Sequence, residues 1–343
     1  MKAAPFDYVR AADLPHALEL LAQHGSDAKL LAGGQSLVPM MAMRLVRPAW
    51  LIDIHRIAEL QQVTSTGGTV VIGAGVRQRT LEDAFDDVDG ADPANRATRN
   101  QNPTLRAQLP LVAQALRWVG HGQTRNRGTV GGSLVHADPS AELPLAALVL
   151  DATLHLARHS AASETAGSAA GEAAGPAQRR LNASAFFTGP MSCAATDTEC
   201  LTAVGWPVWQ GAGVGSAFDE VAIRHGDFAL ASAAAQVQFD ADGVCRRASF
   251  GAGGVAGVPL VFPQLAQRLL GQALTGARAN NDLIAGIAAD AAAACDPGSD
   301  PHASSAFRRH LAQVLITRVL RQAITQATQR AAQQARHAQP SHH

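Results

Sequence analysis

The sequence predicts an α+β fold built in consecutive parts, and three observations support this. In the first sixty residues, helical patterns alternate with short apolar strands. Further along, apolar and polar residues alternate between glycine-rich turns, as in hairpin-forming sheets. Amphipathic helical stretches then close the chain. A chain of 343 residues suffices for two or three domains. We therefore expect a small α/β lobe, a mixed or antiparallel α+β lobe, and a C-terminal α+β domain with an antiparallel sheet.

The composition excludes several classes of function. The chain has 28 basic and 28 acidic residues, so no net charge favours nucleic acid or an anionic membrane as the main partner. Aromatic residues make up only 4%, which argues against base stacking. No uninterrupted apolar stretch approaches the roughly 18 residues of a membrane span, and no secretory signal is present. We expect a soluble cytoplasmic protein without membrane insertion.

The cysteines give no sign of a metal centre on this chain. The sequence contains no C-x-x-C pair and no H-E-x-x-H pattern. Isolated reduced thiols are therefore the preferred interpretation of Cys193, Cys200, Cys245 and Cys295.

The first expected unit spans residues 1–62. A helix is predicted over 13–25, with Asp13 as its N-cap and Gly25 at its end. The apolar run 28–32 predicts a strand buried on both faces. Two glycines follow, then a helix over 36–46 and a second strand over 50–54.

The second expected unit spans residues 63–215. It opens with a glycine-rich hairpin pattern at 67–76, followed by a helix at 80–84 with Thr80 and Asp83 at capping-box-like spacing. Amphipathic periodicity predicts a helix over 109–120, and residues 136–157 read as a helix followed by a strand. Residues 159–180 are rich in Ala, Gly, Ser and Glu, which predicts a flexible exposed insertion.

The third expected unit spans residues 216–330. Alternation over 229–255 predicts two antiparallel strands around a turn at 240–243. Two helices follow. The last is expected to be capped by Ser304 or Ser305 and to present an i, i+4 apolar face. This apolar face consists of Phe307, Leu311, Leu315 and Val319. Residues 331–343 are expected to form a disordered tail.

Two glycine stretches carry the functional signal. "AGGQSLV" (32–38) and "VGGSLV" (130–135) repeat each other almost letter for letter. Because glycine has no Cβ, successive backbone N–H groups can turn toward phosphate oxygens, and a helix that starts there adds its positive end. A bulky residue at Gly33 or Gly132 is then expected to fill the phosphate space. A plain turn remains the alternative for either stretch alone.

The pair of stretches favours one ligand with two phosphates held between two lobes. Neither stretch has the G-x-G-x-x-G or G-x-x-x-x-G-K-[ST] spacing, so a Rossmann site and a P-loop are both disfavoured. Asp138 and Glu142 follow the second stretch and could accept hydrogen bonds from ribose hydroxyls.

Three segments together closely resemble the FAD-binding medium subunit of the molybdenum hydroxylases, the carbon monoxide dehydrogenase and xanthine dehydrogenase family. They are "AGGQSLVPMMAMR", "RNRGTVGGSLVHADPSAELP" and "SAFDEVAIRHGDFALA", and the resemblance covers about residues 1–325. It implies two N-terminal lobes that clasp FAD and a C-terminal α+β domain. The residues that it places at FAD are Ala32, Gly33, Gly34, Gln35, Ser36, Leu37, Thr129, Gly131, Gly132, Ser133, Asp138, Glu142, Leu201 and Phe218.

The resemblance also implies partners and an electron path. A large subunit would hold the molybdenum cofactor, a small subunit would hold two [2Fe–2S] clusters, and this chain would pass their electrons to an external acceptor. A heterotrimer, assembled as a dimer of trimers, is expected, and no catalytic residue is expected here. Asp219 stands where xanthine dehydrogenases place a lysine, and Gly226 where they place an acidic residue. Both differences favour the carbon monoxide dehydrogenase-like branch and a quinone, cytochrome or oxygen rather than NAD⁺.

Two other functions remain open from the sequence. One is a self-sufficient FAD-dependent oxidase of related fold, and the other is an interaction protein whose glycines form ordinary turns. Several residues also keep two interpretations. His121, His136 and His225 could approach a flavin or be ordinary loop histidines, and Arg125 and Arg127 could face phosphate or solvent. The methionines at 40, 41 and 43 and Trp118 are interpreted as core.

Overall fold

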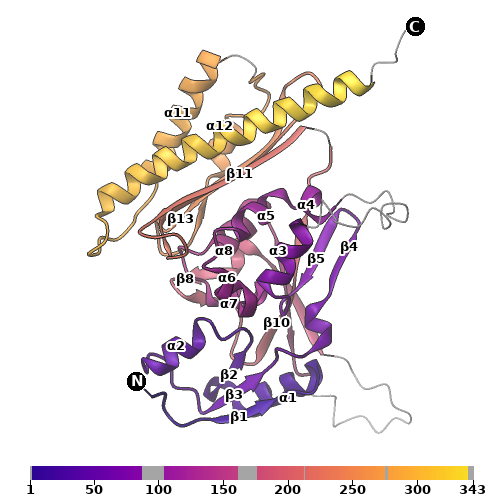
Figure 1. Ribbon diagram of the computed structural model, residues 1–343, viewed down its shortest axis with the longest axis vertical. Coiled ribbons are helices and arrows are strands. Elements are labelled where there is room, and N and C mark those ends of the chain that lie inside the picture. The colour runs from indigo at the N-terminus through magenta and orange to yellow at the C-terminus, as the bar shows by residue number, and fades with distance from the viewer. Residues whose placement is uncertain (1, 87–103, 161–175, 212, 275–276, 339–343) are drawn as a thin grey trace.

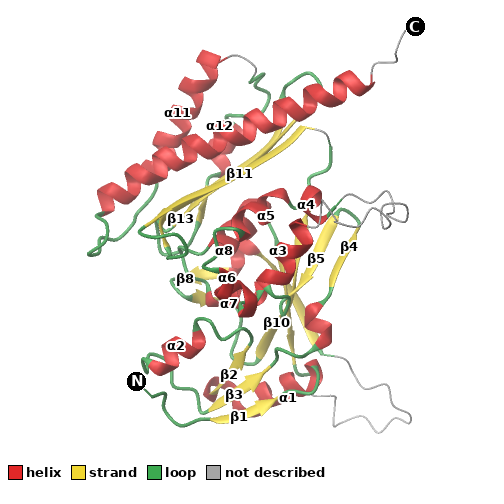
Figure 2. Cartoon of the chain, in the orientation of Figure 1, coloured by secondary structure: helices red, strands yellow, loops and turns green. Residues whose placement is uncertain are grey.

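The computed structural model describes residues 2–86, 104–160, 176–211, 213–274 and 277–338. In these residues, three larger sheets follow one another along the long axis of the molecule (Figures 1 and 2). The N-terminal sheet lies at one end, a five-stranded sheet with several helices lies in the middle, and a four-stranded sheet with two long helices lies at the other end. The expected α+β architecture is therefore confirmed.

The N-terminal lobe is a three-stranded parallel sheet in the order β1-β3-β2. The sequence pattern did not predict β1. Strand β2 is half-buried rather than buried on both faces, because it lies at the edge of the sheet. Asp13 caps α1 as expected, through a bond from the His16 N–H, and Gly25 ends it. The elements are β1 (Asp7–Arg10), α1 (Leu14–His24), η1 (Gly25–Asp27), β2 (Ala28–Leu31), α2 (Leu37–Ala42), β3 (Trp50–Asp53) and η2 (Ala58–Gln61).

Helix α2 is shorter than the predicted 36–46. Arg44 adopts a left-handed conformation, with φ of 61°, so the helix cannot continue through it. Met41 is buried, whereas Met43 is about half exposed, so the interpretation of the methionines as core is right only in part.

The middle sheet is antiparallel, in the order β4-β5-β10-β6-β7. Helix α3 begins two residues before Thr80, so the predicted capping box is wrong. Residues 177–180 belong to a strand rather than to the expected loop, of which 161–175 lie outside the described residues. The strands are β4 (Val63–Thr66), β5 (Thr69–Gly73), β6 (Thr153–Arg158), β7 (Ala177–Asn182) and β10 (Glu199–Pro207), with a small pair β8 (Phe187–Gly189) and β9 (Ser192–Cys193).

Helices cover the middle sheet and fill the centre of the molecule (Figure 1). The predicted helix 109–120 is shorter, and two short helices flank it. Residues of the second glycine stretch lie inside a helix, α7, rather than in a loop. The helices are α3 (Gln78–Asp86), α4 (Leu105–Gln108), α5 (Pro110–Leu116), α6 (Gly122–Arg127), α7 (Val130–His136), α8 (Glu142–Leu150) and α9 (Ala183–Phe186).

The C-terminal sheet is antiparallel, in the order β11-β12-β13-β14. The predicted turn at 240–243 is confirmed, since the Asp240 carboxylate accepts bonds from the Asp242 and Val244 N–H groups. Helix α12 lies along one face of this sheet, and α5 and α8 pack on the other. The elements are β11 (Gly213–Ala222), β12 (Ala229–Phe239), β13 (Cys245–Gly253), β14 (Leu260–Val261), α10 (Pro263–Gln267), α11 (Ala277–Ala293) and α12 (Ser305–Ala338).

The observed helix α12 differs in two ways from what the sequence predicted for the end of the chain. Ser304 is the cap, accepting from the Phe307 N–H, but Phe307 is 45% exposed. Leu315 and Val319 are fully buried, as predicted. The helix also runs to Ala338, so residues 331–338 are helical rather than a disordered tail, and 339–343 lie outside the described residues.

Candidate functional site

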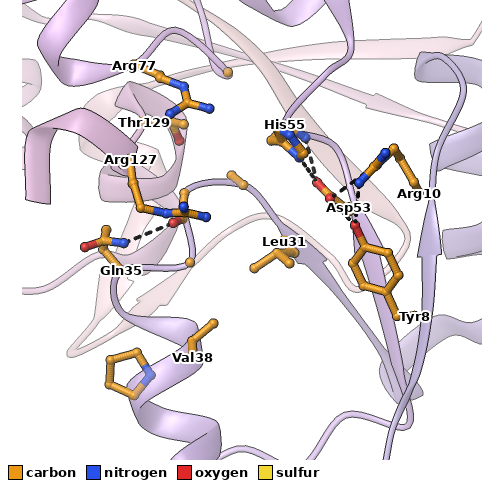
Figure 3. A pocket seen from close by; sticks show the side chains of 15 residues that line it. Tyr8, Arg10, Leu31, Gln35, Val38, Asp53, His55, Arg77, Arg127 and Thr129 are labelled. Atoms are coloured by element: carbon orange, nitrogen blue, oxygen red, sulfur yellow. Dashed lines mark hydrogen bonds and ion pairs between the residues drawn. The ribbon is translucent and has the colours of Figure 1, made fainter.

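A crevice of about 660 Å³ lies between the N-terminal lobe and the middle of the chain (Figure 3). The first lobe forms it with the ends of its three parallel strands and the start of α2. The second lobe contributes residues next to β5 and α7. The lining residues are Tyr8, Arg10, Leu31, Ala32, Gly33, Gly34, Gln35, Val38, Pro39, Asp53, His55, Gly75, Arg77, Arg127 and Thr129.

The first glycine stretch turns the chain from β2 to α2 at this crevice. Gly34 has φ of +71°, a conformation that favours glycine. Among the described residues, no hydrogen bond uses the backbone N–H of residues 33–36. Because unpaired backbone donors need a partner, this loop is suited to bind an anion.

The reason for glycine at position 33 differs from the expected one. A Cβ there would lie 2.3 Å from the Arg127 carbonyl oxygen and 2.8 Å from the Gly128 Cα. The residue therefore allows close contact between the two lobes, rather than leaving space for a phosphate.

The second glycine stretch is already engaged by the protein. Thr129 caps α7, its Oγ1 accepting from the Gly132 N–H at 3.0 Å. The Val130 and Gly131 N–H groups donate to the carbonyls of Val76 and Ala74. A Cβ on Gly131 would lie 2.4 Å from the Ala74 Cβ, so this glycine allows α7 to pack against the end of β5. At Gly132 a Cβ would meet the Thr129 hydroxyl.

Three arginines make the crevice basic. Arg10 lies on one wall, and Arg77 and Arg127 lie on the other, near Thr129 and Gln35 (Figure 3). Arg77 donates to the Asn126 carbonyl at 2.7 Å, and within the described part of the chain Arg127 has no ion pair. Guanidinium groups bind phosphate through paired hydrogen bonds, so the crevice matches a diphosphate in charge and donor type.

The sequence interpretation missed a polar group on the opposite wall. The Tyr8 hydroxyl and the His55 Nδ1 both contact the buried Asp53 carboxylate, the latter at 2.6 Å, and the His55 N–H donates to it at 3.0 Å (Figure 3). Burial alone would raise the pKa of Asp53, but these hydrogen bonds outweigh it and hold the pKa below its usual value. The signal in the sequence was a carboxylate at the end of a strand.

The other predicted residues lie outside this crevice. Asp138 accepts from the Ser140 N–H at 2.8 Å, and Glu142 begins α8, with burial raising its pKa to about 7. Leu201 on β10 and Phe218 on β11 are buried in the central apolar core. The crevice is not lined by Ser36, Leu37, Gly131, Gly132, Ser133, Asp138, Glu142, Leu201 or Phe218.

Three of the ambiguous residues have structural contacts. Arg125 pairs with Glu82 at 3.0 Å and donates to the carbonyls of Val119 and Gly120, so it faces neither phosphate nor open solvent. The rings of His121 and His225 pack edge to face, with centroids 6.4 Å apart. Trp118 packs beside His225 and is half-buried against the core.

Among the described residues, no three His, Cys, Asp or Glu side chains lie together in a way that could hold a metal ion. None of the helices in the described ranges is long and apolar enough to cross a membrane.

Known proteins match the chain along almost its whole length. Residues 4–209 match the FAD binding domain in molybdopterin dehydrogenase, and residues 216–323 match the CO dehydrogenase flavoprotein C-terminal domain. The 6-hydroxypseudooxynicotine dehydrogenase complex subunit alpha of Paenarthrobacter nicotinovorans is 36% identical, over 95% of this chain and 97% of the relative. Caffeine dehydrogenase subunit beta of a Pseudomonas species is 32% identical, over 94% and 96%.

A solved structure supports the same relationship. A chain of carbon monoxide dehydrogenase from Hydrogenophaga pseudoflava superimposes with a TM-score of 0.80 at 29% identity, covering 95% of this chain and 99% of the other. The free amides and guanidinium groups of the crevice fit the diphosphate of FAD. The chain therefore belongs to the FAD-binding medium subunits of the molybdenum-dependent dehydrogenases, the family of the carbon monoxide dehydrogenase medium chains and the xanthine dehydrogenase FAD-binding subunits.

Proposed function

We propose that this subunit collects electrons from a [2Fe–2S] cluster of a small partner and passes them through FAD to an external acceptor. The observation that carries the proposal is the crevice between the lobes, which a loop with unpaired backbone amides lines together with Arg77 and Arg127. The FAD diphosphate would lie there, held by the loop of residues 32–35 and by these arginines, with the start of α2 directly behind the loop. When bound, FAD would supply both one-electron and two-electron redox chemistry.

The remaining proposed contacts extend from α7 toward the C-terminal domain. Thr129 lies at both the crevice and the start of α7, and Gly132 and Ser133 are only half-buried beyond it. We assign Asp138 and Glu142 to the ribose side of FAD, and Leu201 and Phe218 to the surroundings of the flavin ring. In this arrangement the chain binds and orients the cofactor and excludes water from it, and no residue acts as a general base.

The acceptor is proposed to be a quinone, a cytochrome or oxygen rather than NAD⁺. Asp219 points to the face of β11 that α12 covers, where Arg318 holds it at 2.6 Å. Gly226 packs against the His121 ring and brings no carboxylate. Both positions therefore lack the charged groups that the xanthine dehydrogenase branch places there.

The partners proposed are a large molybdenum subunit and the small [2Fe–2S] subunit, in a dimer of heterotrimers. Exposed apolar side chains on and after α2 support a protein contact there, namely Val38 (51% exposed), Met43 (49%) and Leu45 (69%). We also propose domain boundaries near residues 62 and 215. Each of the three parts contains most of one apolar cluster, and a few residues, such as Ala157 and Phe218, join the cluster of the neighbouring part.

Equilibrium binding of FAD to the purified full chain tests the proposal. Arg127→Gln is expected to lower FAD affinity about 10-fold, since a hydrogen bond to a charged group contributes roughly 1.5–3 kcal/mol. Arg321→Gln, on the exposed face of α12, is the matched control and should bind FAD as the wild type does.

Two outcomes would contradict the proposal. A wild-type chain that binds no FAD would exclude the crevice as its site. Oxidation of an organic substrate by the isolated flavoprotein, without molybdenum or iron–sulfur partners, would instead identify a self-sufficient oxidase.

A further inference from the structure

The parallel strands β2 and β3 bring two segments to the crevice at their carboxyl ends. Leu31 and Asp53 are paired across these strands, and the Ile54 N–H donates to the Leu31 carbonyl at 3.0 Å. The loop of residues 32–35 follows β2, His55 follows β3, and both line the crevice. Ligands of open α/β sheets bind at the carboxyl ends of the strands. His55 therefore leaves the sheet at the same edge as the loop with unpaired amides.

The Asp53 carboxylate fixes the imidazole ring of His55. The His55 Nδ1 lies 2.6 Å from Asp53 Oδ1, and the His55 backbone N–H donates to the same oxygen at 3.0 Å (Figure 3). Burial raises the pKa of Asp53, but the bonds from Tyr8 and His55 outweigh it and hold the pKa below its usual value. The carboxylate is thus ionised at neutral pH and can only accept, so Nδ1 carries a proton whether the ring is neutral or charged.

Nε2 is the atom of His55 whose state can change. The His55 side chain is 29% exposed and lines the crevice. Within the described part of the chain, Nε2 has no hydrogen-bond partner. A neutral ring with its proton on Nδ1 offers only an acceptor lone pair at Nε2, whereas a protonated ring offers an N–H donor and a positive charge. Only the protonated form can therefore bind an anion.

The charged groups around the crevice act on this ring in opposite directions. Asp53 favours the protonated ring, whereas Arg10 on β1 and Arg77 and Arg127 of the second lobe disfavour it. A bound diphosphate would pair with the arginines and add its own negative charge, which moves the balance toward the protonated ring. By linkage, protonation of the ring must then raise the affinity for the anion by the same factor.

Other charged groups next to β3 are directed away from the ring. Lys29 on β2 pairs with Asp197 at 3.0 Å. Glu59 on η2 accepts from the Leu14 N–H at the start of α1, at 3.4 Å. Arg56, the next residue in the chain, is exposed and does not line the crevice. The groups that decide the charge of His55 are therefore Asp53, the three arginines and the ligand.

We propose that His55, oriented by Asp53, binds the diphosphate of the cofactor as an imidazolium, so that a proton enters the crevice with the anion. This assignment rests on the proposed function, which places the diphosphate beside residues 32–35, and adds a residue to that site. The Nε2–H would donate to a phosphate oxygen from the first lobe, while Arg77 and Arg127 donate from the second. The proton comes from solvent when the cofactor binds and returns to solvent when it leaves.

The pH dependence of FAD binding to the purified full chain tests the proposal. The Kd of the wild type should rise about 10-fold between about pH 5 and pH 8, the range in which an imidazole loses its proton. His55→Gln cannot gain this proton, so its Kd should stay near the value of the wild type at pH 8 throughout. The exposed His310→Gln on α12 is the matched control and should follow the wild type. A His55→Gln profile identical to that of the wild type would overturn the proposal.

Asp53→Asn tests whether the carboxylate acts through the ring. Loss of the negative charge beside Nδ1 should move the rise in Kd toward lower pH, because the protonated ring loses its stabilising partner. A rise at the same pH as in the wild type would overturn the positioning role of Asp53. If Asp53→Asn is too unstable to purify, His55→Gln still decides the proposal.

Calorimetry counts the proton directly. Heats of FAD binding near pH 7, measured in buffers of different ionisation enthalpy, should show proton uptake by the wild type and none by His55→Gln. ADP-ribose, a diphosphate diester without a flavin, should compete with FAD and give the same uptake.

Three results would contradict these expectations in different ways. Failure of ADP-ribose to compete, or competition without uptake, would overturn the contact between His55 and the diphosphate. A wild type that binds FAD without proton uptake would overturn the role of His55 and leave the proposed function standing. A wild type that binds no FAD would overturn the proposed function as well.

Discussion

The two glycine stretches are nearly identical in sequence but differ in what their backbones do. At residues 33–36 the amides of the first stretch have no partner in the described structure, and the loop lines the crevice. In the second stretch, the amides of Val130, Gly131 and Gly132 are bound to Val76, Ala74 and Thr129. The first stretch is therefore open for a ligand, whereas the second anchors a helix to the sheet.

The difference teaches that a glycine pair has no single meaning. Gly34 is needed for its left-handed conformation, Gly33 for contact between lobes, and Gly131 for contact between a helix and a strand. The three roles can be told apart only from the groups that contact each glycine in the folded chain, since the sequence shows the same small residue in each case.

The largest expected effect separates Gly33 from Gly131. Gly33→Ala should force the lobes apart at the Arg127 carbonyl and lower FAD affinity by more than about 10-fold, with little change in unfolding. Gly131→Ala should collide with Ala74 and reduce the free energy of unfolding by about 1–3 kcal/mol. Flavin titration and urea unfolding measure the two quantities. If Gly33→Ala and Gly131→Ala both lose FAD and have the same free energy of unfolding, the two glycines do not have the different roles assigned to them.

An effect on stability no larger than that of Gly131→Ala is expected at Asp53, on the wall facing the first stretch. Because its pKa is lowered in the fold, Asp53 contributes stability above its ordinary pKa of about 4 and loses it as the pH falls further. Asp53→Asn should therefore reduce the free energy of unfolding by about 1–3 kcal/mol near pH 7. The difference from the wild type should shrink in urea unfolding below about pH 4.

The exposed Asp7→Asn on β1 is the control for this experiment and should be neutral. A deficit of Asp53→Asn that stays constant across the acid range would show that packing, rather than charge, accounts for it.

The smallest expected effect concerns the cap of α7. Thr129→Ala should reduce the free energy of unfolding by about 1 kcal/mol, because the Gly132 N–H loses its acceptor. Thr129→Ser should retain most of this stability. If Thr129→Ala instead leaves stability unchanged and weakens FAD binding, the second stretch binds the ligand as directly as the first does.

Much of the fold could be predicted because its signals are local. The Asp13 cap, the Gly25 stop and the turn at Asp240 depend on residues a few positions apart. Strand β1 could not be predicted, since it is held by parallel pairing with β3, more than forty residues away. The length of α2 was missed for a similar reason, because the left-handed Arg44 has no signature in the sequence.

The candidate site divides in the same way. The sequence identified Ala32, Gly33, Gly34, Gln35 and Thr129, all of which line the crevice. It missed Tyr8, Arg10, Asp53, His55 and Arg77, which lie on separate elements and meet only when the sheet forms and the lobes close.

By itself, the sequence determined the family, the α+β class and the first ligand loop, because glycines, caps and alternating apolar residues act over short distances. The tertiary structure decided which glycine stretch has free amides and which arginines line the crevice. Each of these depends on groups brought together from different lobes, where burial and charge are set by neighbours that the linear order does not reveal.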